Sequence, residues 1–337
     1  MRAWEIVSDG GVDALVLNGR PMPEPGIGEV LVKVHASSIN YRDLSTIEDP
    51  VGRGLPYPTV PNSDAAGEIA ALGAGVAGWQ IGDRVASCFF SDWSAGPITP
   101  AAMASALGGA VPGVLAEYVT LPAAGVVSLP DHLSWNEAAT LPCAALTAWH
   151  ALTEPRPVRP GETVLLLGTG GVSVFAQQFC RVMGARTIAT SSSDDKLQRM
   201  KDLGAAVTIN YRSTPDWEKA VLDLTGGTGV DRVVEVGGPG TLQKSIAAAR
   251  VGGQVQLIGI LTGAAGQITP TDIMRKSISV RGIYVGSRQM FNEMNRAIAE
   301  HGLKPVIDET FAFEDARDAY ARMRAASHFG KLVIGVA

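Results

Sequence analysis

The sequence predicts an α/β protein with two parts, a β-rich part and a part built around a parallel, doubly wound sheet. Three observations support this fold class. In the first third, short apolar runs alternate with turns rich in Pro and Gly. From about residue 135, strand-length and helix-length stretches alternate, which is typical of parallel strands joined by helices. A glycine-rich turn follows one of those strands directly, and 337 residues are enough for two hydrophobic cores.

The β-rich part begins with strands expected at residues 14–17 and 29–36, which are separated by the turn-rich residues 21–28. Further short strands are expected at residues 66–72, 83–86 and 116–121.

The α/β part follows as a regular succession of elements. Strands are expected at residues 163–167, 186–190, 207–210, 232–235, 253–258 and 279–284, and helices at residues 172–183, 195–203, 217–224 and 241–248. Two helices (290–301 and 314–325) and a strand (331–336) end the chain, and we expect them to return to the first part. The predicted β-rich domain therefore comprises residues 1–130 and 289–337, and residues 131–288 form the predicted parallel-sheet domain.

The turn after the strand at 163–167 predicts a dinucleotide site. It reads Gly168-Thr169-Gly170-Gly171-Val172-Ser173, close to the G-x-G-x-x-G pattern, with a small residue in the third position. Gly168 would allow the tight turn, Gly170 would let a pyrophosphate approach the backbone, and the helix N-terminus would offer N–H groups to that anion. An ordinary strand–turn–helix without a ligand is the alternative, but the flanking strands favour a nicotinamide cofactor.

The end of the second strand predicts which cofactor binds. NAD sites usually carry an acidic residue there, and this chain has Ser191. Ser191 and Ser192 could donate to a 2′-phosphate and Lys196 could neutralise it, which favours NADP(H). The nearby Asp194 and Asp195 could instead hold a ribose, so NAD(H) remains possible, and the serine run could also cap the next helix.

Composition argues against several partners. The formal net charge is −5 and no cluster of Lys and Arg occurs, so neither nucleic acid nor a membrane surface is expected. The N-terminus lacks the apolar core of a signal peptide, and no uncharged run would span a bilayer. The three cysteines (Cys88, Cys143 and Cys180) are too scattered for a disulfide framework, so we expect a cytoplasmic location.

Four motifs, in order along nearly the whole chain, resemble the medium-chain dehydrogenase/reductase superfamily. They are the hairpin-like residues 23–34, the glycine-spaced residues 62–76, Gly82-Asp83-Arg84-Val85, and the Leu-x-Cys-x-x-x-Thr-Ala-like residues 141–148. The resemblance implies a GroES-like catalytic domain, an NAD(P)-binding Rossmann domain and an active site in the cleft between them.

The positions of zinc ligands in this family depart from its pattern. The resemblance places Asn40, Ser63 and Cys143 where zinc-dependent members have Cys, His and Cys. Zinc needs about three good protein ligands, and Cys143 with Asp64 leaves the site one short. The chain therefore resembles the zinc-independent branch of quinone oxidoreductases and enoyl reductases, and no zinc is expected. Cys143 is interpreted as a small buried residue, with a catalytic role as the alternative.

The segment Asn40-Tyr41-Arg42-Asp43 follows a strand where the family builds its active site. Hydride transfer makes negative charge appear on the acceptor, so hydrogen-bond donors must stabilise it. Tyr41 is the leading donor, with packing against the cofactor as the alternative. Asn40 could orient a carbonyl or a ribose, and Asp43 could orient the neighbouring backbone or Arg42.

The resemblance adds further cofactor contacts. It implies an adenine-side contact from Tyr211, and contacts near the nicotinamide and phosphates from Val285, Ser287 and Lys331. Two loops follow strands of the sheet: one begins at Gly237 and the other contains Ile260. We expect both loops to lie beside the nicotinamide.

The function that these residues favour is an NADPH-dependent reductase that transfers hydride to an activated alkene or quinone, a small conjugated carbonyl substrate. An alcohol or aldehyde dehydrogenase of the same superfamily is the first alternative. A non-catalytic NADP(H)-binding redox sensor is the second, because no residue is a convincing acid or base. The open edge of the strand at 279–284 favours a homodimer.

Overall fold

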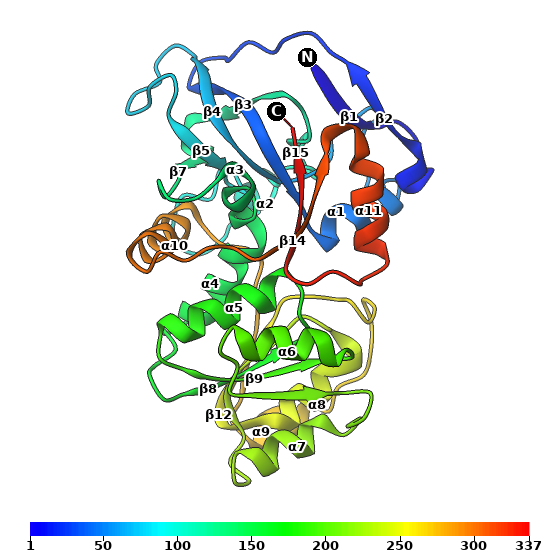
Figure 1. The fold of residues 1–337 in the computed structure, drawn as a ribbon, viewed down its shortest axis with the longest axis vertical. Coiled ribbons are helices and arrows are strands. Elements are labelled where there is room, and N and C mark those ends of the chain that lie inside the picture. Colours follow the sequence, from blue (N-terminus) through cyan, green and yellow to red (C-terminus); the bar gives the residue numbers. More distant parts are fainter. Residues whose placement is uncertain (337) are drawn as a thin grey trace. The chain divides into compact units, whose positions relative to one another are not determined.

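The computed structural model describes residues 1–336 and divides into two compact units. One unit contains residues 1–146 together with the segment from residue 285 onward, and the other is Thr147–Tyr284 (Figure 1). Within residues 1–336, no helix has both the length and the apolar character needed to cross a membrane.

A seven-stranded sheet forms the framework of the first unit. Its order is β14-β15-β3-β4-β5-β7, and β6 also pairs with β3. The strands are β3 (Glu29–Ile39), β4 (Asp64–Leu72), β5 (Arg84–Ser87), β6 (Tyr118–Pro122), β7 (Val126–Ser128), β14 (Ile307–Ala312) and β15 (Lys331–Gly335). A separate hairpin joins β1 (Arg2–Ile6) to β2 (Leu15–Gly19). The sequence analysis did not anticipate β1 or β7.

Helices of the first unit are short, except near the C-terminus. They are α1 (Tyr41–Glu48), α2 (Pro100–Met103), α3 (Trp135–Ala138), α10 (Arg288–Glu300) and α11 (Ala316–Arg324), together with the π-helical turn η3 (Leu141–Ala145). The 3₁₀ turns are η1 (Gly11–Ala14), η2 (Ala123–Gly125) and η4 (Phe313–Asp315). Apolar side chains of β3, β15 and α11 share one buried core, which includes Val32, Val34, Leu332, Ile334 and Met323.

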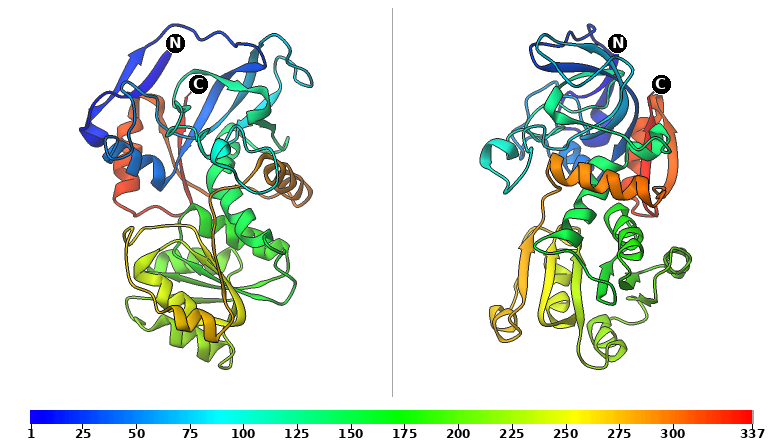
Figure 2. Two further views of the ribbon diagram at one scale, coloured as in Figure 1. Left: turned by 180° about the vertical axis from the view of Figure 1, so that it is seen from behind. Right: turned by 90° about the vertical axis from the view of Figure 1, so that its left-hand side faces the viewer.

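The C-terminal strand completes this sheet. β15 runs parallel to β14 and antiparallel to β3, with Leu332 paired with Ile39 (Figure 2). Gly330 precedes the strand with φ of +77°, and a Cβ there would lie 2.5 Å from the carbonyl oxygen of Val306. Glycine is therefore required at the residue that leads into Lys331.

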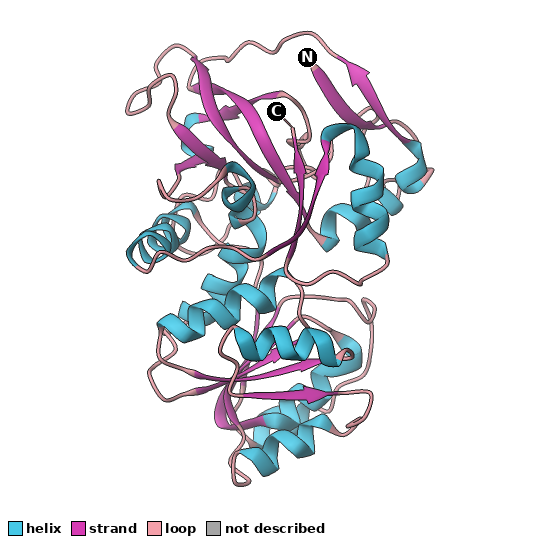
Figure 3. Cartoon of the chain, viewed as in Figure 1, coloured by secondary structure: helices cyan, strands magenta, loops and turns pink. Residues whose placement is uncertain are grey.

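The second unit contains a six-stranded parallel sheet of order β10-β9-β8-β11-β12-β13. The strands are β8 (Thr163–Leu167), β9 (Arg186–Ser191), β10 (Val207–Asn210), β11 (Val230–Glu235), β12 (Ala249–Leu257) and β13 (Ser279–Gly282). The helices are α4 (Leu146–Thr153), α5 (Gly171–Val182), α6 (Asp194–Asp202), α7 (Trp217–Leu224), α8 (Pro239–Ala248) and α9 (Pro270–Arg275), coloured cyan in Figure 3. The predicted combination of a β-rich part and a part with a parallel, doubly wound sheet is confirmed.

The order of the strands reverses between β9 and β11, which lie on opposite sides of β8. In open α/β sheets, ligands bind at the carboxyl ends of the strands beside such a reversal. The sequence analysis placed residues 131–146 with the parallel sheet. The contacts instead group them with the first unit, because α3 packs on β3 and β4 and η3 packs on β4 and β5. The division into domains stays a prediction.

Candidate active site

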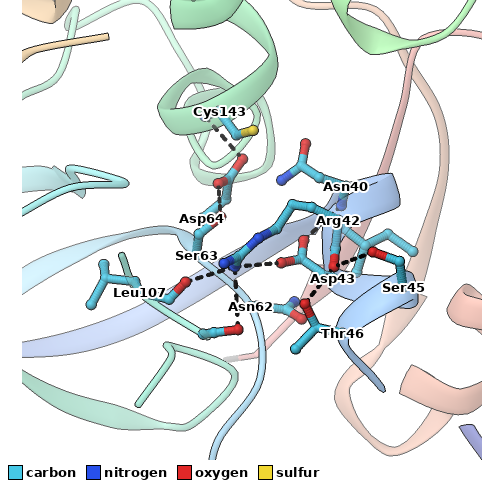
Figure 4. Close-up of polar contacts among 12 residues, drawn as sticks. Asn40, Arg42, Asp43, Ser45, Thr46, Asn62, Ser63, Asp64, Leu107 and Cys143 are labelled. Atoms are coloured by element: carbon cyan, nitrogen blue, oxygen red, sulfur yellow. Dashed lines mark hydrogen bonds and ion pairs between the residues drawn. The ribbon is translucent and has the colours of Figure 1, made fainter. Parts of the chain in front are cut away.

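Four of the predicted catalytic residues lie in the first unit. Asn40 lies between β3 and α1, Tyr41 and Asp43 lie in the first turn of α1, and Cys143 lies in η3. Asn40 and Asp43 are buried, whereas Tyr41 is 46% exposed. The polar contacts of this cluster, apart from Tyr41 and Lys331, are drawn in Figure 4.

Asp64, the first residue of β4, connects β3, β4 and η3. Its carboxylate accepts hydrogen bonds from Ser63 Oγ at 2.6 Å and the backbone N–H of Cys143 at 3.3 Å (Figure 4). It also accepts from Ser38 Oγ at 3.2 Å. Asp64 itself is fully buried. Three donors to one buried carboxylate fix the position of Cys143 relative to the sheet.

Asp43 holds the start of α1 in place. Its carboxylate accepts from the backbone N–H of Asn40 at 2.8 Å and from Arg42 at 3.1 Å. Burial raises the pKa of Asp43 above its ordinary value, and the charge of Arg42 opposes that rise. These contacts fit the predicted orienting role, which stays a prediction.

Arg42 ties α1 to a distant loop, a contact that the sequence did not indicate. Its guanidinium donates to the carbonyl oxygen of Leu107 at 2.7 Å and lies 4.7 Å from the centroid of the Phe89 ring. Loop residues 107–108 are therefore held against the helix that begins with Tyr41.

A buried tyrosine of α11 is hydrogen-bonded to Asn62, which precedes Ser63 and Asp64 of the cluster. Tyr320 of α11 donates its hydroxyl to Asn62 Oδ1, and Asn62 Nδ2 donates to Ser37 Oγ at 3.0 Å. Burial raises the pKa of Tyr320 well above its usual range. Tyr320 therefore stays a neutral donor that fixes the amide of Asn62.

Lys331, predicted as a cofactor contact, lies in this cluster. It is 3% exposed, and its Nζ donates to the carbonyl oxygen of Ile39 at 2.7 Å and to Asn40 Oδ1 at 2.6 Å. Burial lowers the pKa of Lys331, whereas the charge of Asp64 acts in the opposite direction. The resemblance predicted that Lys331 lies near the nicotinamide and phosphates of the cofactor. No sequence motif around Lys331 indicated its contact with Asn40.

These residues do not fit a catalytic zinc ion. The Asn40 amide oxygen is engaged by an ammonium group, and the Ser63 hydroxyl donates to Asp64. Burial and the charge of Asp64 raise the pKa of Cys143 well above its usual range, so Cys143 is a neutral thiol in this cluster. In the described part of the chain, no three His, Cys, Asp or Glu side chains are grouped to hold a metal.

The predicted dinucleotide turn lies in the second unit, between β8 and α5. Gly168 has φ of +73°, and a Cβ added at Gly168 or at Gly170 would meet no atom within 4 Å. The open space beside both glycines, together with the N-terminus of α5, fits a pyrophosphate. Ser173, in the third position, donates its hydroxyl to the carbonyl oxygen of Leu167 at 2.6 Å and so joins α5 to β8.

At the end of β9, the serine run has a structural role in addition to any ligand role. Ser193 Oγ accepts from the backbone N–H of Lys196 and caps α6, as the capping alternative proposed. Ser191 Oγ accepts from the backbone N–H of Ser193, and the Ser191 carbonyl accepts from the N–H of Tyr211. The backbone therefore brings Ser191 and Tyr211 together. Ser192 follows Ser191 directly.

The two loops expected near the nicotinamide, which contain Gly237 and Ile260, are hydrogen-bonded to each other. Thr262 donates its backbone N–H and its hydroxyl to the Gly237 carbonyl, each at 2.8 Å, and its hydroxyl accepts from the N–H of Gly240. Ile260, in the second loop, is 50% exposed.

A buried carboxylate that the sequence analysis did not single out anchors the first of these loops. Glu235 ends β11 and accepts from the N–H of Gly237 at 2.7 Å, the N–H of Gly238 at 3.0 Å, Thr241 Oγ1 at 2.7 Å and Ser245 Oγ. The signal available in the sequence was a charged residue at the end of the apolar run Val233-Val234.

The remaining predicted cofactor residues, Val285 and Ser287, belong to the first unit. Val285 is buried and has φ of +53°. Ser287 Oγ accepts from the backbone N–H of Met290 at 3.2 Å and caps α10.

Two family profiles match the chain. The profile described as "Alcohol dehydrogenase GroES-like domain" matches residues 26–131, and that described as "Zinc-binding dehydrogenase" matches residues 171–300. A zinc-type alcohol dehydrogenase-like protein of Schizosaccharomyces pombe is 43% identical over 92% of this chain and 91% of its own length. A putative alcohol dehydrogenase structure from Sinorhizobium meliloti 1021 has a TM-score of 0.92 and 40% identity, over 99% of this chain and 98% of its own.

Other similar proteins carry both dehydrogenase and reductase names. A structure of an NAD-dependent alcohol dehydrogenase has a TM-score of 0.91 and 35% identity over all of both chains. A mycobacterial protein in complex with NADPH has a TM-score of 0.84 and 28% identity, also over all of both chains. A quinone oxidoreductase structure from Pseudomonas syringae has a TM-score of 0.84 and 27% identity over 99% of each chain. The 2-methylene-furan-3-one reductase of Solanum lycopersicum is 30% identical over 99% of this chain and 79% of its own length.

Proposed function

The chain belongs to the medium-chain dehydrogenase/reductase superfamily, and on this premise we propose that it transfers hydride from NADPH to an activated alkene or quinone without catalytic zinc. Membership makes it an NAD(P)-dependent oxidoreductase. The observation that carries the finer proposal is the donor set at the zinc position, where the Asn40 amide oxygen accepts from the buried Lys331 ammonium, Ser63 donates to Asp64 and Cys143 is protonated.

That donor set favours the proposed substrate class. A simple ketone that accepts hydride concentrates charge on one oxygen, and a Lewis acid such as zinc stabilises it. An enone or a quinone spreads the same charge over a conjugated system, so hydrogen-bond donors alone can suffice. The similarity to a quinone oxidoreductase and to an enone-type reductase supports this class.

NADPH, when bound, supplies the hydride. Asn40 and Tyr41 lie at the start of α1, and we assign to them the hydrogen bonds that hold the acceptor oxygen. Tyr41, which is half-exposed, or a water molecule would deliver the proton. Asp43 orients the backbone of Asn40 through its 2.8 Å hydrogen bond, and Asp64 accepts from the backbone N–H of Cys143.

We assign the cofactor preference to the end of β9. Ser191 stands where an acidic residue would repel a 2′-phosphate, and Ser192, Lys196 and Tyr211 would complete that subsite. The relative solved with NADPH supports NADP(H), and the NAD-dependent relative keeps NAD(H) as the alternative.

We assign the rest of the cofactor to backbone and loop residues. The segment Thr169-Gly170-Gly171-Val172 would hold the pyrophosphate at the N-terminus of α5. The residues Gly237, Ile260, Val285 and Ser287 would contact the nicotinamide end.

We further propose a homodimer in a reducing, cytoplasmic compartment. β13 lies at the edge of the second unit's sheet, and an open edge strand can pair with a second copy. All three cysteines are free thiols.

The test is an oxidation assay of NADPH and NADH with quinones, enones and aldehydes as acceptors, run beside oxidation of simple alcohols and elemental analysis. Turnover with conjugated carbonyls by zinc-free protein is expected. Near-stoichiometric zinc whose removal by a chelator abolishes turnover would contradict the proposal.

A second candidate is an alcohol dehydrogenase, which the names of three of the relatives described above favour. Efficient oxidation of simple alcohols, with enones and quinones inert, would support it instead.

A further inference from the structure

Asn40 carries a buried amide whose hydrogen bonding is incomplete. The residue is 9% exposed, and its Nδ2 has no hydrogen-bond partner among residues 1–336. Its Oδ1 accepts from Lys331 Nζ at 2.6 Å. Buried amide N–H groups without acceptors are uncommon in folded proteins, so this one requires an explanation.

The contact with Lys331 determines which way the amide faces. An ammonium group only donates hydrogen bonds, so the amide atom beside it must be the oxygen. The NH₂ group of Asn40 is therefore turned away from Lys331. A cation on the oxygen also polarises the amide and makes its N–H groups stronger donors.

Lys331 is held in this place by the fold. Leu332 pairs with Ile39 across the antiparallel strands β15 and β3, so the preceding residue, Lys331, falls opposite Asn40. Its second hydrogen bond, to the carbonyl oxygen of Ile39, fixes the ammonium at the end of β3. The charge of Asp64 also acts on Lys331, and Figure 4 shows Asn40 in the same polar cluster as Asp64.

We propose that Lys331 is a positioning residue, which turns the N–H donors of Asn40 toward the carbonyl oxygen of the hydride acceptor. This inference rests on the proposed function and deepens it. When hydride adds to the β-carbon of an enone, the electron pair of the C=C bond shifts and leaves an enolate, as NADPH becomes NADP⁺. The enolate oxygen accepts from Asn40 Nδ2, and the α-carbon then takes up one proton. Lys331 acts through Asn40 and does not touch the acceptor.

The test compares Asn40→Asp and Lys331→Met in the full-length protein, with 2-cyclohexen-1-one and 1,4-benzoquinone as acceptors at saturating NADPH. Asn40→Asp keeps an acceptor for the Lys331 ammonium but removes the N–H donors. Lys331→Met removes the ammonium. A matched control is Lys276→Met, because Lys276 also donates to backbone carbonyl oxygens, those of Ile246, Ala247 and Ala249, but lies in the other unit.

Both cluster variants should lower kcat by about 100-fold, as loss of one oxyanion donor does, with the Kd of NADPH within threefold of wild type. Lys276→Met should keep kcat within twofold. In infrared difference spectra, the carbonyl stretch of bound enone should lie at lower frequency in the wild type than in Asn40→Asp, a shift that a merely structural role would not produce.

The inference is overturned if Asn40→Asp retains kcat within tenfold of wild type. It is also overturned if Lys331→Met weakens NADPH binding tenfold or more while kcat at saturation is unchanged, because Lys331 would then serve the cofactor. If Lys331→Met does not fold, Asn40→Asp still decides. A wild type that oxidises only alcohols would refute the proposed function alone, and the same variants would then be compared on the alcohol.

Discussion

Replacement of Glu235 should damage both the stability of the second unit and its affinity for NADPH. Glu235 is fully buried and accepts four hydrogen bonds from the segment that follows β11. Two of the donors are backbone N–H groups of the buried residues Gly237 and Gly238. That loop in turn receives both hydrogen bonds from Thr262, so one side chain supports two loops.

The size of the effect follows from the donors that lose their acceptor. In Glu235→Ala, two buried N–H groups lose their acceptor at about 1–3 kcal/mol each, so we expect a loss of roughly 2–6 kcal/mol in the free energy of unfolding. In Glu235→Gln, the amide oxygen can still accept three bonds and the Ser245 hydroxyl can accept from the amide. Glu235→Gln therefore loses only the extra strength that a charged acceptor gives these hydrogen bonds, about 1–2 kcal/mol in the free energy of unfolding.

Urea unfolding and a fluorescence titration with NADPH measure the two quantities. If about a third of the free energy lost in Glu235→Ala is also lost from NADPH binding, the affinity for NADPH falls about tenfold, because 1.4 kcal/mol corresponds to a factor of ten. The matched control is Glu162→Gln. Glu162 precedes β8 and so lies at the amino ends of the parallel strands, whereas Glu235 lies at the carboxyl end of β11; Glu162 accepts from Arg156 and from the N–H of Arg159. This control should lose stability but keep the wild-type Kd for NADPH. The reasoning is refuted if Glu235→Ala loses less than 1 kcal/mol, or binds NADPH within twofold of wild type.

Four further outcomes are expected. NADPH should bind more tightly than NADH, and Lys196→Met should narrow the difference; equal dissociation constants in the wild type would contradict this. Tyr41→Phe should lower kcat by about 100-fold with little change in the Kd of NADPH, and full activity would make Tyr41 a packing residue. Burial raises the pKa of Asp43 in the folded protein, so the stability that Asp43 contributes is complete below its unfolded-state pKa and is lost as the pH rises through its folded-state pKa. In urea unfolding measured at several pH values, Asp43→Asn should abolish this pH-dependent loss of stability. Light scattering at micromolar concentration should give a dimer, and a monomer mass would reject pairing through β13.

The fold was accessible from the sequence because its signals are local. The run 163–167, the glycine turn and the helix that follows lie within about 20 residues, and strand–helix alternation restricts the topology to parallel crossovers. β7 was missed because a three-residue strand is too short to show periodicity. The grouping of residues 131–146 depended on the packing of α3 and η3, which no local pattern reports.

The candidate site was accessible only in part. Asn40, Asp43 and Cys143 were proposed from motifs, and the structure places Asn40 directly after β3, Asp43 in the first turn of α1 and Cys143 in η3. Contacts between segments far apart in sequence were not found. Arg42 reaches Leu107, and Tyr320 reaches Asn62 across 258 residues. Neither contact has a sequence signature, because each depends on where α11 and the loop at 107–108 pack.

The sequence by itself determined the order of strands and helices, the dinucleotide turn and the absence of good zinc ligands at residues 40 and 63. These depend on residue type and spacing within short segments. Only the tertiary structure decided that Lys331 would hold Asn40, 291 residues earlier in the chain. That contact exists because β15 pairs with β3 in one particular antiparallel register, and register depends on the burial of whole strand faces rather than on any local motif. Burial then lowers the pKa of Lys331 and raises that of Cys143, since desolvation acts only after the core has closed around them.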